Sequence, residues 1–330
     1  MTRAQQAQGA SDRTGMQLLI TGGAGFIGTH LCTRLRTNPN HSIRVLDDGS
    51  GLPNGISSEV DGVEYVGGSV LDRGLLSDVT QDVDCIVHLA GVTHPAIAYS
   101  NPAETFEINA LGSAYVAEAA MSANNAHLIC MSSGSVYGAN PATPTHEGLT
   151  PLPQEPYAAS KLAGEAMVMS YRHAYGLPVL LLRPFEVFGT GQPTDHRSGA
   201  QVAGLISAAS NKQPARIPND GRTASDLLAV NDLVTYLVRA IERKISYSAP
   251  INVASGIRVT TLELVALISS LLAEPMMLEH VLAPPNADQN RIADTTRLRA
   301  VFGELYRTPM IEVLSEMLIA ERAKQLVPNA

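Results

Sequence analysis

The stretch Thr21-Gly22-Gly23-Ala24-Gly25-Phe26-Ile27-Gly28 decides the fold of this chain. Its pattern Gly-x-x-Gly-x-x-Gly lies between an apolar run at 17–20 that predicts a strand and an apolar periodicity that predicts a helix. Glycines at these places permit a tight turn, close approach of the backbone to a pyrophosphate and close packing of helix on strand. The N-terminus of the helix favours negative charge. Gly22, Gly25 and Gly28 therefore predict a dinucleotide-binding loop.

An acidic residue follows the second apolar run and extends this interpretation. The run at 42–46 predicts a strand that ends at Asp47 and Asp48. A carboxylate at Asp47 is placed to accept hydrogen bonds from the adenosine ribose, and it would repel the 2′-phosphate of NADP, so NAD is the expected cofactor. We interpret Asp48 as a solvated turn residue. The alternative for the whole motif is a tight turn without a ligand, but the flanking strand, helix and carboxylate favour a site.

The same alternation of short apolar runs and helical patterns continues to residue 185, which is typical of a parallel sheet covered by helices. Strands are predicted at 17–20, 42–46, 63–66, 85–90, 127–131 and 179–182, and helices at 103–123 and 157–175. Beyond residue 185, Pro, Gly and Asn cluster and the rhythm changes. We predict a disordered extension at 1–15, a nucleotide-binding domain at 16–185 joined by a later strand near 226–230, and a smaller α/β part at 186–330 that mainly binds substrate.

The bulk properties restrict the class of protein. A chain of 330 residues allows one or two domains with a large core, and a net charge of −8 argues against a role in coating nucleic acid. No window approaches the ~20 apolar residues of a membrane span, and no apolar secretory signal is present. Cys32, Cys85 and Cys130 lie in apolar contexts and are predicted to be buried free thiols of a soluble cytoplasmic protein. The histidine spacings predict no metal site.

A second motif suggests redox chemistry on a hydroxyl group. Tyr157 and Lys161 are four residues apart, so a helix places them on one face. A nearby ammonium lowers the pKa of a phenol from ~10 toward neutrality, which would make Tyr157 a general base for a sugar or alcohol. Ser133, at the mouth of the fifth predicted strand, can hydrogen-bond the same oxygen. A surface Tyr–Lys pair is the alternative, which the dinucleotide loop upstream disfavours.

With these motifs, the chain resembles the extended short-chain dehydrogenase/reductases, and within them the nucleotide-sugar epimerase/dehydratase group. The likeness includes Val-Leu-Asp-Asp at 45–48, Ser-Ser-Gly-Ser-Val-Tyr-Gly at 132–138 and Leu-Arg-Pro-Phe at 182–185. Further matching segments are 21–28, 88–91, 109–112 and 157–161. They cover most of residues 16–190 in the family's order and spacing, and a weaker likeness continues at 219–221, 230–233, 252–256 and 293–295.

The resemblance implies a Rossmann-type, doubly wound parallel sheet that retains NAD, with Tyr157 as the base, Lys161 on the nicotinamide ribose and Ser133 on the substrate. In members like UDP-glucose 4-epimerase, the base removes the 4-hydroxyl proton while hydride passes to NAD; hydride then returns to the other face of the turned keto-sugar. The cofactor contacts that it implies are Gly22, Gly25, Phe26, Ile27, Gly28, Asp47, Leu89, Ala90, Asn109, Tyr157, Lys161 and Pro184.

The resemblance also implies a homodimer paired through the helices at 103–123 and 157–175. Small residues at Ala110, Ala114 and Ala117 suit such an interface, and they suit packing on the sheet equally well.

The reaction branch depends on the residues after Ser133. Dehydratases of the group carry Asp-Glu there and decarboxylases a Glu, whereas this chain has Gly134 and Ser135, which cannot exchange a proton as a carboxyl does. The loop therefore favours an epimerase, with Ser133 and Ser135 facing the substrate. A keto-sugar reductase or dehydrogenase, a dehydratase, and a non-enzymatic NAD-binding regulator stay as alternatives.

The substrate half departs from the family pattern. Glu186 replaces an Asn that lies beside the nucleotide-sugar in relatives, so it either meets the sugar or is a surface or hinge residue. Ser225 replaces an Arg that holds the diphosphate, a role that Arg222 or Arg291 could take unless both are solvated. Thr93 stands where some epimerases have Lys. The expected substrate is a nucleotide-sugar held differently, or a sugar or polyol without the diphosphate.

Overall fold

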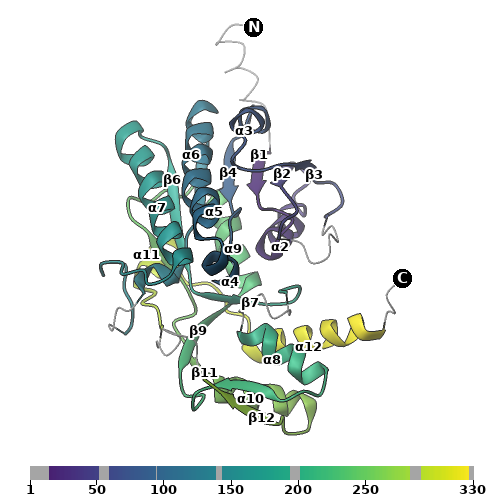
Figure 1. Cartoon of the computed structure of the whole chain (residues 1–330). Helices are drawn as coiled ribbons and strands as arrows, with labels where there is room; N and C mark the ends of the chain where they lie inside the picture. The colour runs from purple at the N-terminus through teal and green to yellow at the C-terminus, as the bar shows by residue number, and fades with distance from the viewer. Residues whose placement is uncertain are drawn as a thin grey trace, which may run out of the picture.

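The computed structural model describes residues 15–51, 59–93, 95–138, 143–193, 201–282 and 291–326. The predicted extension falls on residues 1–14, which lie outside the described residues, and on Gly15, which lies in a bend just before the first strand. Figure 1 shows a large sheet with helices on both faces and a smaller part below the lower edge of that sheet.

The large sheet has seven strands in the order β10-β6-β5-β4-β1-β2-β3, and every neighbouring pair is parallel. The strands are β1 (Gln17–Thr21), β2 (Ser42–Asp47), β3 (Glu64–Gly67), β4 (Cys85–His88), β5 (His127–Met131), β6 (Val179–Pro184) and β10 (Ile251–Val253). The central strands are continuous apolar runs because helices cover both of their faces. The predicted doubly wound parallel sheet is confirmed.

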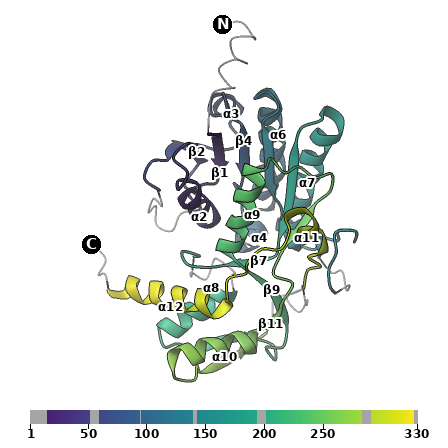
Figure 2. The ribbon, with the colours of Figure 1, turned by 180° about the vertical axis from the view of Figure 1, so that it is seen from behind.

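Alternate residues of β1 point into two different cores. Leu18 and Ile20 pack with helices α2 (Phe26–Leu35), α9 (Val230–Glu242) and α11 (Thr296–Phe302), whereas Leu19 packs with α3 (Arg73–Val79), α6 (Gly112–Ser122) and α7 (Pro156–Tyr175). The first three helices lie on the face nearer the viewer in Figure 2, and the other three cover the opposite face. Cys32 lies in the first core, Cys85 lies at the same sheet face, and Cys130 lies in the second; all three are buried and free, as predicted.

The region predicted as one helix over 103–123 is divided into three segments. They are α5 (Pro102–Phe106), the π-helix η2 (Glu107–Leu111) and α6, with the short helix α4 (Pro95–Ser100) before them. Ala110, Ala114 and Ala117 are buried within the chain itself. A Cβ on Gly164 of α7 would lie 2.8 Å from the backbone oxygen of Asn109, so small residues allow η2 and α7 to pack closely.

The strand that returns to the large sheet is not the predicted one. Residues 224–229 form β9 (Ala224–Ala229), whose two edges are already occupied by β7 (Glu186–Phe188) and β11 (Arg258–Thr260) in a separate three-stranded sheet. The chain instead returns through α9, which covers the large sheet, and β10 pairs with Leu182–Pro184 of β6. The prediction of a returning strand near 226–230 is therefore wrong.

The smaller part has its own apolar core below the carboxyl ends of the large sheet (Figure 1). Besides the three-stranded sheet, it contains α8 (Gln201–Ser210), β8 (Ala215–Pro218), α10 (Thr261–Leu272), β12 (Leu278–Val281) and α12 (Met310–Leu326). In a doubly wound sheet, ligands bind beyond the carboxyl ends of the strands, so the site is expected between this part and the sheet. The exact division of the chain at residue 185 stays a prediction. Beyond that residue, α9, β10 and α11 still belong to the layers of the large sheet.

Candidate active site

The glycine loop leaves the carboxyl end of β1 in a tight turn. Gly22 has φ +71°, and its N–H donates to the Leu46 carbonyl at 2.8 Å. A Cβ on Gly22 would lie 2.6 Å from the backbone nitrogen of Ala90, and one on Gly28 would lie 2.5 Å from the Cα of Gly23. These two glycines therefore let the loop lie against the segment after β4 and let α2 pack on the turn.

The N-terminus of α2 is available to an anion. Gly25 is the N-cap, and among the described residues no side chain caps the helix and no acidic residue lies in its first turn, which begins with Phe26 and Ile27. The N–H groups of a first turn and the helix dipole favour a phosphate. Gly25 has φ −72°, a value that any residue can adopt, so its backbone conformation does not require glycine. Its lack of a side chain instead leaves room beside the loop.

Asp47 holds the loop from the end of β2. One of its carboxylate oxygens accepts from the Ala24 N–H at 3.0 Å and the other from the Gly49 N–H at 2.9 Å. The carboxylate is thus fixed beside the glycine turn, where a dinucleotide's adenosine ribose is expected, and a hydrogen-bond acceptor at this place fits NAD. Asp48 accepts from the backbone and the side chain of Ser50, which agrees with its interpretation as a turn residue.

Asn109 connects the loop after β4 with the helix that carries Tyr157. Its side-chain oxygen accepts from the Val92 N–H at 2.8 Å, and its side-chain nitrogen donates to the Val92 carbonyl and to the Ser160 hydroxyl, both at 2.9 Å. Leu89 and Ala90, at the start of this loop, both donate backbone hydrogen bonds to Thr21. The predicted cofactor residues of β1, β4 and η2 thus meet at one edge of the sheet.

His88 lies beneath this edge as a buried core residue. Its two ring nitrogens lie 2.7 Å from the Thr21 hydroxyl and 3.1 Å from the Ser113 hydroxyl. Burial, with a contribution from the Lys161 charge, lowers the pKa of His88 to about 3, so the ring is neutral at physiological pH.

Tyr157 and Ser133 are in contact, and Lys161 lies near them at the end of β5. The side chains of Tyr157 and Ser133 are hydrogen bonded, and the Ser133 hydroxyl also accepts from the Ser135 N–H at 3.1 Å. Lys161 is buried one helical turn after Tyr157, and its ammonium donates to the Met131 carbonyl at 2.9 Å. Met131 ends β5, whereas Pro184 ends β6 beside it and is also buried. The three predicted catalytic groups and Pro184 therefore lie at the same sheet edge as the glycine loop.

One expectation about Tyr157 is wrong in this structure. Burial raises the pKa of its phenol, the Ser133 hydrogen bond opposes that rise, and the Glu155 carboxylate adds to it. The pKa of Tyr157 is thus raised, where the sequence predicted that Lys161 lowers it; the Lys161 ammonium donates to the Met131 carbonyl. Burial also lowers the pKa of Lys161, while Cys130 and Glu165 oppose this effect.

On the substrate side, Arg291 and Glu186 lie near the segment 132–138 after β5, which carries Ser133 and Ser135 and which we name the serine loop. The Arg291 guanidinium lies 3.4 Å from the Ser135 hydroxyl, and the backbones of Arg291 and Ser225 form a β-bridge. Glu186 accepts hydrogen bonds from the Ser225 side chain and from the Gln201 backbone. Burial raises the pKa of Glu186, and the Arg291 charge opposes this rise. Of the two open interpretations of Glu186, the structure favours a place beside the site over a surface position.

Two other predicted substrate residues lie apart from this group. Arg222 is exposed, with Asp220 as its ion-pair partner at 3.8 Å, and Thr93 is exposed in the loop after β4. Asp226, the residue after Ser225, is buried and accepts from Ser255, Gly256 and Ala293, so it anchors the segment that carries Arg291. A contact of Arg222 or Thr93 with substrate stays a prediction.

Several polar residues of the site region were not predicted. Glu155 is the N-cap of α7, and the charge of its carboxylate raises the pKa of both Tyr157 and Arg291. Glu165 lies one turn beyond Lys161 and binds Arg183 through two hydrogen bonds. The spacing from Tyr157 to Lys161 to Glu165 is a signal that places all three on one helical face, whereas a single carboxyl before Pro156 gives no such signal.

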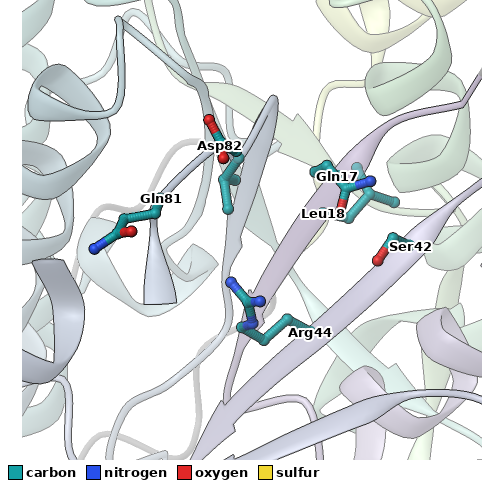
Figure 3. A pocket seen from close by; sticks show the side chains of 7 residues that line it. Gln17, Leu18, Ser42, Arg44, Gln81 and Asp82 are labelled. Carbon is teal, nitrogen blue, oxygen red and sulfur yellow. The ribbon is translucent and has the colours of Figure 1, made fainter. Parts of the chain in front are cut away.

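The structure also contains a cavity of about 200 Å³ at the opposite edge of the sheet. Figure 3 shows Gln17, Leu18, Ser42, Arg44, Gln81 and Asp82 around it. It lies at the amino ends of β1 and β2. Arg44 there is paired with Glu64 at 2.9 Å and with the Val79 carbonyl. This cavity is therefore separate from the predicted catalytic groups.

Within the described parts of the chain, no helix is long and apolar enough to cross a membrane. The same residues contain no group of three His, Cys, Asp or Glu side chains arranged to hold a metal ion.

A sequence model of the NAD dependent epimerase/dehydratase family matches residues 18–254, which span the glycine loop, Asp47, Ser133, Tyr157 and Lys161. The chain belongs to this family. The cofactor prediction is confirmed with it: the family's cofactor is NAD, and the open helix N-terminus and the glycine turn suit its diphosphate.

Members of the NAD dependent epimerase/dehydratase family with different activities are similar to this chain. UDP-glucose 4-epimerase of Mycolicibacterium smegmatis is 34% identical over 297 residues, covering 87% of this chain and 93% of the relative. GDP-6-deoxy-D-mannose reductase of Pseudomonas aeruginosa is 30% identical, covering 88% and 90%. The structure of MoeE5 in complex with UDP-glucuronic acid and NAD has a TM-score of 0.80 at 26% identity, covering 93% and 99%. The family is thus established, and the individual reaction is not fixed by likeness alone.

Proposed function

We propose that the chain is an NAD-dependent 4-epimerase of a nucleotide-linked sugar. The observation that carries this proposal is the hydrogen bond between Tyr157 and Ser133, with Lys161 one turn further along α7 and no carboxyl group at 134 or 135. A phenol and a hydroxyl so arranged can share the proton of a sugar hydroxyl. Gly134 and Ser135 give the site no acid at the place where dehydratases have one.

Each polar side chain has a distinct task in this mechanism. Ser133 holds the substrate hydroxyl against Tyr157, whose oxygen takes the proton during oxidation at C4 and returns it during reduction. Lys161 donates to the Met131 carbonyl, and in this mechanism it would bind the nicotinamide ribose and orient the cofactor. Asn109 fixes the loop after β4 to α7 through Val92 and Ser160, so that the catalytic helix and the cofactor edge keep one spacing.

NAD, when bound, accepts hydride from C4 and gives it back, and its nicotinamide charge favours the phenolate of Tyr157. The raised pKa of Tyr157 in the protein alone has a clear consequence: the phenol stays protonated at neutral pH until a positive charge is added to the site. The base is therefore active mainly in the loaded enzyme.

Arg291 supports a substrate with a diphosphate. Its guanidinium lies beside Ser135, two residues from the serine that binds Tyr157, so an anionic group held by Arg291 would keep the sugar within reach of the catalytic tyrosine. The UDP-glucose 4-epimerase relative acts on a sugar of this class. The similarity to a GDP-6-deoxy-D-mannose reductase supports the second candidate, a keto-sugar reductase with exchangeable cofactor.

We further propose that the enzyme is a homodimer that pairs through α7 and the helical segments from α4 to α6. Tyr99 of α4, Phe106 of α5, Leu111 of η2 and Met167 of α7 are large apolar side chains with 40–56% exposure. Since Ala110, Ala114 and Ala117 are buried within the chain, these exposed residues, and not the alanines, would form the interface. The three buried free thiols are consistent with the proposed cytoplasmic location.

The test is turnover without net redox change. Purified protein given UDP-glucose is expected to form the C4 epimer with no added NAD and no accumulation of NADH. Tyr157→Phe is expected to lower the rate by about 10²- to 10⁴-fold while the protein still binds NAD. Stoichiometric formation of NADH would favour the reductase instead. Turnover unaffected by Tyr157→Phe would remove the catalytic assignment altogether.

A further inference from the structure

The charged groups around Arg291 form a cluster that we name the Arg291 cluster: Glu155, Glu186 and Arg291. Arg291 is attracted to both carboxyl groups, while burial lowers its pKa. The cluster therefore offers one guanidinium against two carboxyl groups.

The geometry connects this cluster to the reaction centre from two sides. Arg291 lies 3.4 Å from the Ser135 hydroxyl, and the Ser135 N–H binds the Ser133 hydroxyl that meets Tyr157. From the other side, Glu155 is the N-cap of α7, two residues before Tyr157, and its charge acts on that phenol. A sugar whose hydroxyl contacts Tyr157 is therefore close to the Glu155 carboxyl group.

Glu186 completes the cluster from β7. Its side chain is held by the Ser225 hydroxyl and the Gln201 backbone, and Ser225 forms the backbone bridge to Arg291. Phe185, just before it, lies against Gly134, since a Cβ on Gly134 would be 3.0 Å from the Phe185 ring. Glu186 is thus fixed beside the serine loop rather than free to turn into solvent.

We propose that the Arg291 cluster selects a neutral sugar and rejects a uronic acid, with Glu155 and Glu186 as the specificity-determining residues. A carboxylate on the sugar would face Glu155 and Glu186, and the Arg291 guanidinium, which we assign to the diphosphate and which both carboxyl groups already attract, would not be left to pair with it. A neutral sugar escapes this repulsion, and its hydroxyls can donate to the carboxyl oxygens. This inference rests on the proposed function, because it takes the sugar to lie against Tyr157.

The test compares two ligands that differ only at C6: UDP-glucose and UDP-glucuronic acid. Calorimetric titration of the NAD-loaded protein is expected to show UDP-glucose binding at least about tenfold more tightly, which corresponds to about 1.4 kcal/mol. Glu155→Gln and Glu186→Gln each keep the side-chain shape and remove a charge. Each is expected to reduce this preference several-fold, chiefly by tightening the binding of UDP-glucuronic acid.

Glu64→Gln is the matched control, because it removes a carboxylate that is paired with an arginine, Arg44, at the far edge of the sheet. It is expected to leave the preference unchanged. Equal binding of the two ligands by the unaltered protein, binding of neither, or a preference that survives both glutamine variants would overturn the proposal. The binding measurement does not depend on catalytic activity. A protein that binds UDP-glucose more tightly than UDP-glucuronic acid but epimerises neither would therefore count against the proposed function alone.

Discussion

Arg183 and Glu165 form a buried ion pair that joins β6 to α7, with the Arg183 Nη2 atom 2.6 Å from Glu165 Oε2. A second bond of 2.8 Å joins the same two side chains, and both are about 5% exposed. Arg183 also donates to the Tyr137 hydroxyl at 2.9 Å, and Tyr137 donates in turn to Asn252 of β10 at 2.7 Å. The pair therefore connects the catalytic helix, the end of the serine loop and two sheet strands.

Removing one member of this pair should destabilise the protein strongly. Although burial opposes its charge, Glu165 and Tyr137 raise the pKa of Arg183, so the guanidinium stays charged. Glu165→Ala would leave that charge buried without its main partner, and a loss of about 3–5 kcal/mol in the free energy of unfolding is expected. Urea denaturation followed by circular dichroism measures it.

The double variant Glu165→Leu with Arg183→Met separates the ion pair from general packing. Because it removes both charges, its loss should be smaller than the sum of the single losses. Additive losses would show that the two side chains act independently.

The glycines of the loop should divide into one needed for the cofactor and one needed for the fold. Among the described residues, a Cβ on Gly25 would meet only the Gly22 carbonyl oxygen, at 3.3 Å, and the φ of Gly25 suits any residue, so Gly25→Ala should fold. Its methyl group would occupy the space beside the helix N-terminus, and NAD affinity is expected to fall about tenfold or more. Gly28→Ala would overlap the backbone of Gly23 and should lower the stability itself by about 1–3 kcal/mol.

Thermal melts and fluorescence titration with NADH distinguish these two effects. Gly204→Ala in α8 is the control, since a Cβ there meets nothing within 4 Å among the described residues. It should leave NAD affinity unchanged and, as a helix-interior position, raise the stability by up to about 1 kcal/mol rather than lower it. Equal stability losses for the Gly25 and Gly28 variants would contradict the division.

Asp47 should set the choice between NAD and NADP. Its carboxylate is fixed by the Ala24 and Gly49 N–H groups, so a negative charge faces the position expected for the ribose. Asp47→Asn keeps a hydrogen-bond acceptor and removes the repulsion of a 2′-phosphate. The ratio of the NADP to the NAD dissociation constant is expected to fall by about tenfold or more. Asp48→Asn, which alters only the turn with Ser50, should leave the ratio unchanged.

The sequence predicted the large sheet well because its strands are apolar runs buried on both faces. All six predicted strands exist, and the boundaries differ by a few residues; the fourth ends at His88, before the chain turns into the loop of Ala90 and Val92. The seventh strand was misplaced because Ile251–Val253 has three residues, too few for a periodic pattern. Its place depends on α9 bringing the chain back to β6.

The catalytic side of the site was also predictable, and the substrate side less so. Tyr157 and Lys161 lie on one helix, so their spacing alone places them together, and the loop after β5 brings Ser133 to the same edge. Arg291 lies beside Ser135 with its backbone bridged to Ser225 and its segment anchored by Asp226. Such long-range contacts leave no periodic signal, and the burial that raises the pKa of Tyr157 leaves none either.

The buried imidazole of His88 should make the stability depend on pH below neutrality. Its pKa is lowered from 6.5 to about 3 because burial between Thr21 and Ser113 disfavours the charged ring. In the unfolded chain the ring takes up a proton as the pH falls below 6.5, whereas the folded ring does so only near pH 3. The stabilisation from a neutral His88 is therefore complete above pH 6.5 and is lost progressively as the pH falls from 6.5 toward about 3.

From pH 7 to pH 5 this one residue should account for a loss of about 2 kcal/mol in the free energy of unfolding. His88→Asn can bond to the same two hydroxyls and does not titrate, so it should show a correspondingly shallower decline over that range. Urea denaturation of both proteins at several pH values measures the difference. Equal slopes would mean that the folded ring accepts a proton as readily as the unfolded one, and that the contact with Thr21 and Ser113 tolerates an imidazolium.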